Sequence, residues 1–121
     1  MIVAGFGFRQ SASLASLESA LEKAAGTTIA VDALATLDRK ADQLAPLAQK
    51  LALPLIPIPA DRLIDQPTLT QSSASLAAHG TGSVAEAAAL AALASNARLL
   101  APRSLSPDRL ASCALAESLL P

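Results

Sequence analysis

Ile2-Val3-Ala4-Gly5-Phe6-Gly7-Phe8-Arg9 stands at the start of the chain and is followed by serines. Its residues 2–5 form an apolar run without polar alternation, which is typical of a buried strand. Apolar side chains then recur every three or four residues, at Leu14, Leu17, Leu21 and Ala24, so a helix is expected next. Ser11 or Ser13 can cap this helix, and Gly26 can end it. The opening of the chain therefore predicts a strand followed by a helix.

A second and a third strand are expected further along the chain. Residues 33–37 read Ala-Leu-Ala-Thr-Leu, and residues 54–59 contain three prolines, which suggest an edge strand or a short one. A helix over 44–51 is expected between them. Pro46 would break this helix in mid-course, but with Asp42 as the N-cap it falls in the first turn, where amides lack partners anyway.

The rest of the chain continues the alternation of strands and helices. Ser72 can cap a short helix over 73–78. Ser83-Val84-Ala85-Glu86 has the pattern of a capping box that opens a helix over 84–94. Three smaller elements are expected after it: a strand over 98–101, a short helix that starts at Ser106-Pro107-Asp108, and a strand over 113–116.

This alternation runs through a chain of 121 residues, which is the usual size of one domain. Apolar strands without alternation indicate a sheet that is covered on both faces. We therefore predict one α/β domain over residues 1–121. It is a small three-layer fold with a mostly parallel sheet of four to five strands and helices on both faces.

The composition argues against several classes of function. Lys and Arg number nine and Asp and Glu ten, so the chain lacks the basic surplus of a nonspecific nucleic-acid binder. One histidine and one cysteine, Cys113, argue against a metal centre and exclude an intrachain disulfide. No apolar run reaches the ~18 residues of a membrane span, and the start lacks the basic region of a signal peptide. We expect a cytoplasmic protein with no membrane or nucleic-acid partner, no metal and no cofactor.

Basic side chains gather in the loops that leave the predicted strands. These loops contain five of the nine basic residues: Arg9, Arg39, Lys40, Arg62 and Arg103. In α/β sheets, ligands bind outside the carboxyl ends of strands and beside helix N-termini. The loops would then form one locally positive edge, which favours an anionic ligand. The alternative is that the charges only solvate the loops.

Two stretches that contain glycine fit such a ligand. Gly5-x-Gly7 resembles part of a dinucleotide fingerprint, but the third glycine is missing, so a tight strand-to-helix turn is the simpler interpretation. In Gly80-Thr81-Gly82-Ser83, free amides at residues 82–84 and two hydroxyl groups could hold a carboxylate. The same residues could also serve only to start a helix, and the lysine of a P-loop is absent after them.

Three side chains are candidates for proton transfer, and each has a structural alternative. His79 is a lone loop histidine that can carry a proton near neutral pH, or can simply be solvated. Asp38 follows a strand and can move a proton, or can accept hydrogen bonds from backbone amides. Glu86 can act as a base, or can cap its own helix. The sequence leaves these alternatives open.

Four blocks of the sequence are distinctive when they are taken together: Val3 to Arg9, Ala35 to Asp42, Ser72, and Gly80 to Ala89. Within them stand Thr-Leu-Asp-Arg-Lys and Gly-Thr-Gly-Ser-Val-Ala-Glu-Ala-Ala-Ala. The blocks resemble the cobalamin-biosynthesis family that contains CobE and the C-terminal domain of CbiG. They span nearly the whole chain, and nothing before Val3 looks like the N-terminal part of CbiG. A stand-alone, CobE-like form is therefore expected.

The resemblance implies a part in assembling the corrin ring. A precorrin is a broad apolar ring with many acetate and propionate carboxylates, which suit arginine side chains and helix N-terminal amides. We expect the domain to bind such an intermediate, and to deliver or process it. The predicted ligand-binding residues are Gly5, Gly7, Arg9, Asp38, Arg39, Lys40, Ser72, Gly80, Thr81, Gly82 and Ser83.

Two alternatives to simple binding remain. In CbiG-like proteins the reaction is the opening of a ring-A lactone with loss of a two-carbon aldehyde. The resemblance therefore also allows a hydrolase, with His79, Asp38 or Glu86 moving protons. The third expectation is a docking partner of another enzyme of the pathway, or a homodimer, because the surplus of Ala and Leu could leave an apolar patch exposed.

Overall fold

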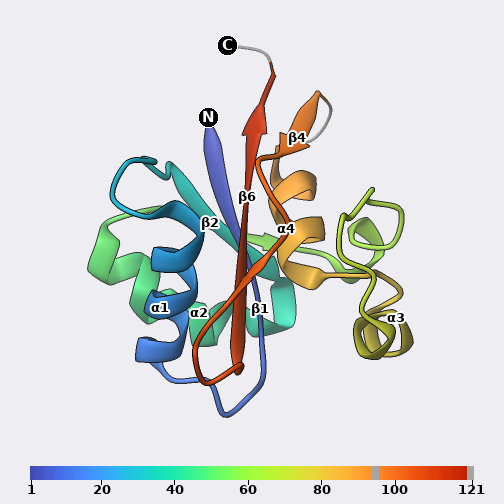
Figure 1. Cartoon of the computed structure of the whole chain (residues 1–121), viewed down its shortest axis with the longest axis horizontal. Helices are drawn as coiled ribbons and strands as arrows, with labels where there is room; N and C mark the ends of the chain where they lie inside the picture. Colours follow the sequence, from blue (N-terminus) through green and yellow to red (C-terminus); the bar gives the residue numbers. More distant parts are fainter. Residues whose placement is uncertain (94–95, 120–121) are drawn as a thin grey trace.

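The computed structural model of the chain describes residues 1–93 and 96–119, which contain one six-stranded sheet (Figure 1). The strands are β1 (Ile2–Phe8), β2 (Ala33–Leu37), β3 (Leu55–Ile58), β4 (Ala97–Leu99), β5 (Ser104–Leu105) and β6 (Ala111–Ser118). Their order along the sheet is β3-β2-β1-β6-β4, and β5 pairs with β6 beside this path. β1, β2 and β3 are parallel, whereas β6 runs antiparallel to β1, β4 and β5. The α/β prediction is confirmed, although the sheet is mixed and has six strands instead of four to five.

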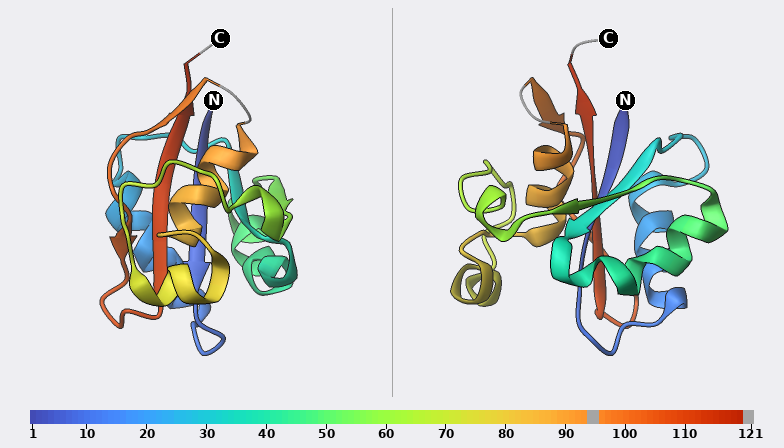
Figure 2. Two further views of the ribbon diagram at one scale, coloured as in Figure 1. Left: turned by 90° about the vertical axis from the view of Figure 1, so that its right-hand side faces the viewer. Right: turned by 180° about the vertical axis from the view of Figure 1, so that it is seen from behind.

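Helices cover both faces of this sheet, as predicted. They are α1 (Leu14–Ala25), α2 (Ala41–Leu51), α3 (Ser73–His79) and α4 (Val84–Ala92), with the 3-10 turns η1 (Asp38–Lys40) and η2 (Ala60–Arg62). α1 and α2 pack on one face through leucines such as Leu17 and Leu47, and α4 packs on the other through alanines such as Ala87 and Ala91. Figures 1 and 2 show α1 and α4 on opposite sides of β1 and β6. Within the described residues, no helix is long and apolar enough to cross a membrane.

The central strand β1 serves both cores. Val3 faces the core under α4, and Phe6 faces the core under α1 and α2. At Gly5, a Cβ atom would lie 2.0 Å from the carbonyl oxygen of Ala85 and 2.6 Å from the amide nitrogen of Ala89. Glycine therefore lets the alanine-rich helix α4 approach the backbone of β1.

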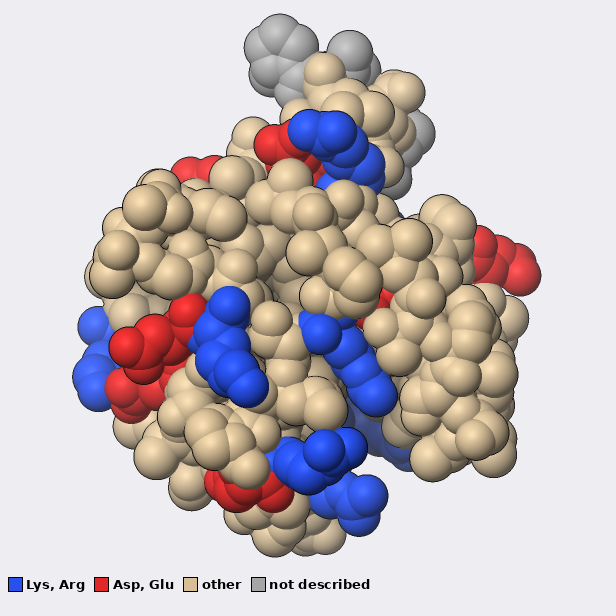
Figure 3. Space-filling view, viewed as in Figure 1, with Lys and Arg blue, Asp and Glu red and all other residues tan. Residues whose placement is uncertain are grey.

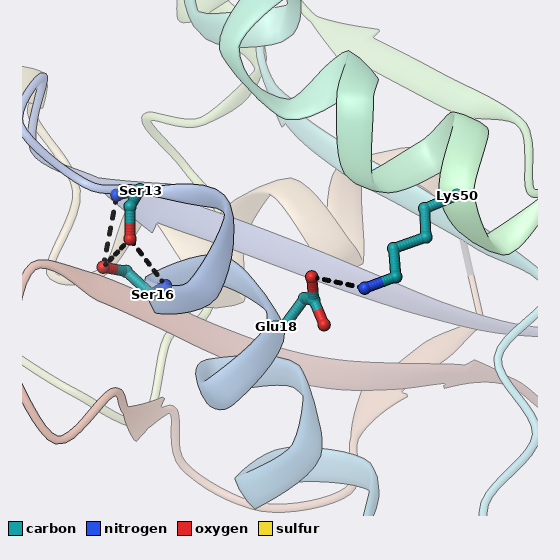
Figure 4. A network of polar contacts seen from close by, with 4 residues as sticks. All are labelled: Ser13, Ser16, Glu18 and Lys50. Carbon is teal, nitrogen blue, oxygen red and sulfur yellow. Dashed lines mark hydrogen bonds and ion pairs between the residues drawn. The ribbon is translucent and has the colours of Figure 1, made fainter.

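The start of α1 confirms one of two predicted caps. Ser13, and not Ser11, is the N-cap: its Oγ accepts a hydrogen bond from the amide of Ser16, and the Oγ of Ser16 accepts one from the amide of Ser13 (Figure 4). Figure 4 also shows Lys50 of α2 reaching Glu18 of α1, at 2.9 Å. This exposed ion pair contributes at most about 1 kcal/mol to stability, so apolar packing determines how α1 and α2 meet.

The start of α2 corrects the prediction for Pro46. The helix begins at Ala41, directly after η1, and no side chain caps it, so Asp42 is not the N-cap. Pro46 therefore lies inside the helix and beyond its first turn. Because proline has no amide hydrogen, one hydrogen bond of the helix is missing there.

A turn replaces the short helix expected at Ser106-Pro107-Asp108. The Oδ1 of Asp108 accepts hydrogen bonds from the hydroxyl group of Ser106 and the amide of Leu110, and these bonds close a tight connection between β5 and β6. Serine and aspartate side chains bond to nearby backbone in turns as readily as at helix starts, which explains the error.

Element boundaries in the second half of the chain differ from the predictions by a few residues. α4 ends at Ala92, and residue 94, the last of the predicted helix, lies outside the described residues. The strands expected over 98–101 and 113–116 extend over Ala97–Leu99 and Ala111–Ser118. The last strand is longer than predicted because β6 pairs along the whole length of β1.

Candidate functional site

A pocket of about 380 Å³ opens at the edge of the sheet where β1 ends and β6 begins. Its lining comes from the end of β1, from α3, from the start of α4 and from the chain between Arg103 and Ser112. Figure 3, seen from the same direction as Figure 1, shows Lys and Arg side chains along the hollow between the main body and the part that carries α3. The pocket thus combines segments that are far apart in the sequence.

Three arginines line this pocket, namely Arg9, Arg103 and Arg109. Among the described residues, none of their guanidinium groups has a hydrogen-bond or ion-pair partner. Other basic side chains are engaged elsewhere: Lys50 pairs with Glu18, Arg98 pairs with Glu117, and Arg62 donates to the carbonyl oxygen of Ala91. A free guanidinium group offers a permanent charge and a planar set of donors that fits a carboxylate or phosphate. The pocket is therefore suited to an anion.

The turn between β5 and β6 fixes the backbone of Arg109. This residue has a φ of +62°, in the left-handed region that favours glycine, and its amide donates to the carbonyl oxygen of Ser106 at 2.9 Å. Asp108 braces the turn by accepting from the hydroxyl groups of Ser106 and Ser16, at 2.6 and 2.5 Å. These bonds hold the pKa of the Asp108 carboxyl below its usual value. An arginine thus occupies a position where glycine would be less strained, and it lines the pocket from there.

α3 contributes a wall of small side chains. Ala74, Ser75 and Ala78 line the pocket, and the buried Oγ of Ser75 has no hydrogen-bond partner among the described residues. Ser72 caps the helix as predicted, because its side chain accepts from the amide of Ser75. The wall is therefore mostly apolar, with one free hydroxyl group.

His79 lines the pocket from the last turn of α3. Partial burial lowers the pKa of its imidazole below 6.5, and the nearby charges of Arg39 and Lys40 lower it further. The imidazole is therefore neutral at pH 7 and can accept a proton or a hydrogen bond.

η1 lies beside the pocket and does not line it. Lys40 donates from Nζ to the carbonyl oxygen of Phe8 at 3.3 Å, and its Nζ lies 5.4 Å from the centre of the Phe8 ring. Asp38 accepts from the amide of Arg39 through Oδ1 at 2.7 Å, which is the structural alternative left open by the sequence. The contribution of η1 to the pocket is thus its positive charge near His79.

Glu86 is fully buried and lies outside the pocket lining. Ser83 caps α4 as predicted, since its Oγ accepts from the amide of Glu86 at 3.2 Å. The second half of the predicted capping box is wrong, because the carboxylate of Glu86 instead accepts from the amides of Leu69, Thr70 and Arg103 and from the hydroxyl group of Thr70. Burial alone would raise the pKa of Glu86, but these hydrogen bonds, above all those from Thr70, outweigh burial and lower it. Glu86 is therefore ionised and held by its neighbours.

The predicted site residues divide between the pocket and its surroundings. The pocket lining contains Gly7, Arg9, Ser72 and His79. The others lie outside the lining: Gly5, Asp38, Arg39, Lys40, Gly80, Thr81, Gly82, Ser83 and Glu86. Gly82 permits close packing, because a Cβ there would lie 2.2 Å from the carbonyl oxygen of Thr70.

The sequence reasoning missed Ser75 and Arg109, and it identified Arg103 only as one of several basic loop residues. Arg109 was not predicted as a site residue because a helix was expected from Ser106, and a helix would not return the chain to the end of β1. A signal was present in Pro107-Asp108, which also favours a turn.

The pocket offers groups for binding but no metal centre. Within the described residues, no cluster of three or more His, Cys, Asp or Glu side chains could hold a metal ion. Cys113 is buried, and burial raises the pKa of its thiol, so it behaves as a small apolar residue. Arginines and an apolar wall in one pocket suit an anion that also carries an apolar surface.

A family model matches nearly the whole chain. The model of a family described as "Cobalamin synthesis G C-terminus" matches residues 2–116, and the chain therefore belongs to this family of cobalamin biosynthesis proteins. The family resemblance predicted from the sequence is confirmed. Comparison with curated proteins gives no match.

Solved structures support the same assignment. The crystal structure of CobE, a protein from the cobalamin (vitamin B12) biosynthetic pathway, is 37% identical, with a TM-score of 0.85 over 98% of this chain and 91% of that chain. The cobalamin biosynthesis protein chiG from Agrobacterium tumefaciens is 39% identical, with a TM-score of 0.73 over 98% of this chain and 99% of that chain. A putative cobalamin biosynthesis protein G homolog from Sulfolobus solfataricus shares the fold at 17% identity, with a TM-score of 0.73 over 95% of this chain and 36% of that chain.

Proposed function

We propose that this domain binds a precorrin intermediate of cobalamin biosynthesis through the carboxylates of the ring. The observation that carries the proposal is that Arg9, Arg103 and Arg109, with no partners among the described residues, line one pocket of about 380 Å³. A hydrogen bond to a charged group contributes about 1.5–3 kcal/mol, and arginine forms two such bonds with one carboxylate. Several guanidinium groups around one pocket suit a ligand with several carboxylates.

The shape of the pocket supports a ring that is held by one edge. Ala74 and Ala78 line the side formed by α3, and Gly7 lines the end of β1, so a flat apolar surface can approach the backbone closely. A tetrapyrrole with its side chains is larger than this pocket. Most of a bound ring would therefore stay exposed, which would leave it accessible to a second protein and supports delivery as part of the function.

Titration with uroporphyrin tests the proposal, because this stable tetrapyrrole carries an acetate and a propionate on each pyrrole. The absorbance of the ring is expected to shift at micromolar protein, and Arg9→Ala is expected to weaken binding by about ten- to hundredfold. Lys23→Ala is the matched control, since Lys23 is an exposed cation outside the pocket lining. Equal losses in both variants, or no shift with uroporphyrin and with enzymatically prepared precorrins, would contradict the proposal.

A second candidate function is the hydrolytic opening of a precorrin lactone, and the placement of His79 supports it. A neutral imidazole in the pocket can take a proton from water while the oxygen of that water bonds to the lactone carbonyl carbon. The ester bond to the ring oxygen then breaks, and the proton passes to that oxygen. In a single-turnover assay with a lactone-bearing precorrin, the ring-opened hydroxy acid is expected to carry the mass of one added water. A later carbon–carbon cleavage that releases a two-carbon aldehyde would lower the mass of the ring product by the mass of that aldehyde. His79→Gln is expected to stop the reaction and Asp38→Asn to leave it unchanged, and activity in both variants would exclude this role of His79.

A further inference from the structure

α3 forms one wall of the pocket, although apolar packing does not hold it there. None of its residues is buried, and its largest apolar side chain, Leu76, is 45% exposed. Helices in small domains are usually held by an apolar face that is buried against the core. The position of α3 must therefore come from polar contacts of the segments at its ends.

The segment before α3 is tied to α4 by hydrogen bonds. Oε1 of Glu86 accepts from the amides of Leu69 and Thr70, at 2.6 and 2.9 Å, and Oε2 accepts from the hydroxyl group of Thr70. A further bond joins the amide of Ser72 to the carbonyl oxygen of Gly82, at 3.0 Å. Glu86 thus supplies the acceptors for most of these contacts.

A second segment of the pocket lining, at Arg103 and Leu105, is tied to the same carboxylate. Oε2 of Glu86 also accepts from the amide of Arg103, at 2.9 Å. Arg103 and Leu105 line the pocket, so this bond fixes the backbone that carries one of the three arginines. One buried anion therefore joins two segments that are far apart in the sequence and that both continue into the pocket.

We propose that Glu86 is a positioning residue that sets the width of the pocket by holding the α3 wall and the Arg103 wall together. Glu86 does not line the pocket, so it acts only through the backbone that it holds. A buried carboxylate surrounded by donors has a fixed geometry, since each bond that is lost leaves a polar group unsatisfied. The inference concerns the pocket of the proposed function, but its first test requires no ligand.

Two substitutions release the two walls separately. In Glu86→Gln, the amide oxygen can keep the place of Oε1 between Leu69 and Thr70, and the amide nitrogen then faces the amide of Arg103, a donor against a donor. Thr70→Val removes only the hydroxyl bond on the α3 side. Thr81→Val is the control, because Thr81 is a buried threonine whose Oγ1 has no partner among the described residues.

Hydrogen exchange of backbone amides measures the release directly. In Glu86→Gln, exchange at Arg103 and its neighbours is expected to increase about tenfold, with no change in β1, β2 or α1. In Thr70→Val, faster exchange is expected in the segment 69–72 and in α3, and in Thr81→Val at neither place. A uniform increase over the whole domain, or no local increase, would overturn the inference. If Glu86→Gln does not fold, the result for Thr70→Val decides, and no faster exchange in 69–72 and α3 overturns the inference.

Uroporphyrin binding then separates this inference from the proposed function. If the wild-type protein binds, Glu86→Gln is expected to bind about tenfold more weakly, and equal affinity would overturn the positioning role while the proposed function stands. If the wild-type protein binds neither uroporphyrin nor enzymatically prepared precorrins although exchange changes at the two walls only, the proposed function fails and the positioning role stands.

Discussion

Replacement of Arg109 by glycine is expected to stabilise the fold and to weaken ligand binding. A φ of +62° costs a residue other than glycine about 1–2 kcal/mol, which glycine avoids. The greater freedom of glycine in the unfolded chain returns about 0.5–1 kcal/mol of this gain. The hydrogen bond from the amide to Ser106 remains, and no side-chain bond within the described residues is lost. The free energy of unfolding is therefore expected to rise by roughly 0–1.5 kcal/mol, and Tm by up to about 7 °C.

Binding is expected to change in the opposite direction. Loss of the Arg109 guanidinium removes about 1.5–3 kcal/mol, so uroporphyrin should bind about ten- to hundredfold more weakly. Thermal unfolding followed by circular dichroism and absorbance titration measure the two effects. Arg109→Ala is the control, because alanine keeps the strained backbone and should lose affinity without a gain in stability. A clear fall in Tm with unchanged affinity would show that the side chain holds the turn, and the reasoning about the pocket would be refuted.

The remaining predictions concern packing and pH. Gly5→Ala is expected to lower the free energy of unfolding by about 3 kcal/mol in urea titrations, because the new methyl group would lie 2.0 Å from the carbonyl oxygen of Ala85. Gly7→Ala, whose nearest contact is 3.2 Å, is expected to lose less than about 1 kcal/mol, and equal losses would contradict the packing argument. The pKa of His79 is lower in the folded chain than in the unfolded chain, so protonation of His79 destabilises the fold as the pH falls below 6.5. Between about pH 7.5 and 5.5, Tm should therefore fall more in wild type than in His79→Gln. Identical pH profiles of Tm would contradict the lowered pKa of His79. The pKa of Glu86 is also lowered, so the stability that its carboxylate contributes is present above pH 4.5 and is lost as the pH falls through the pKa of the folded state. The urea midpoints of wild type and Glu86→Gln should therefore converge in acid. A constant difference between the two midpoints would contradict the lowered pKa of Glu86.

Local patterns in the sequence were sufficient for most of the fold. The apolar runs at 2–5 and 33–37 predict β1 and β2, and Ser13, Ser72 and Ser83 were each foreseen as helix caps. These features depend on residues within one turn or one strand, so the sequence displays them directly. The direction of β6 depends instead on the connection before it, and there the same residues fit a helix start and a turn.

The composition of the pocket was harder to predict because it depends on distant contacts. Arg62 was grouped with the basic edge, yet its guanidinium donates to the carbonyl oxygen of Ala91 near the end of α4. Glu86 was expected to cap α4, yet its carboxylate accepts hydrogen bonds from the amides of Leu69, Thr70 and Arg103 instead. Position in a loop predicts that a charge is near an edge, but only the tertiary fold determines whether the charge already has a partner.

The antiparallel direction of β6 explains how Arg9 and Arg109 come to line the same pocket. In a fully parallel sheet, the strand beside β1 would begin at the opposite edge, far from the residues that follow β1. Because β6 is antiparallel, its first residue, Ala111, pairs with Phe8, the last residue of β1, and the amide of Arg9 donates to the carbonyl oxygen of Leu110 at 2.9 Å. The turn that precedes β6 therefore brings Arg109 to the same pocket as Arg9. The departure from parallel order thus joins the two ends of the sequence in one cationic site.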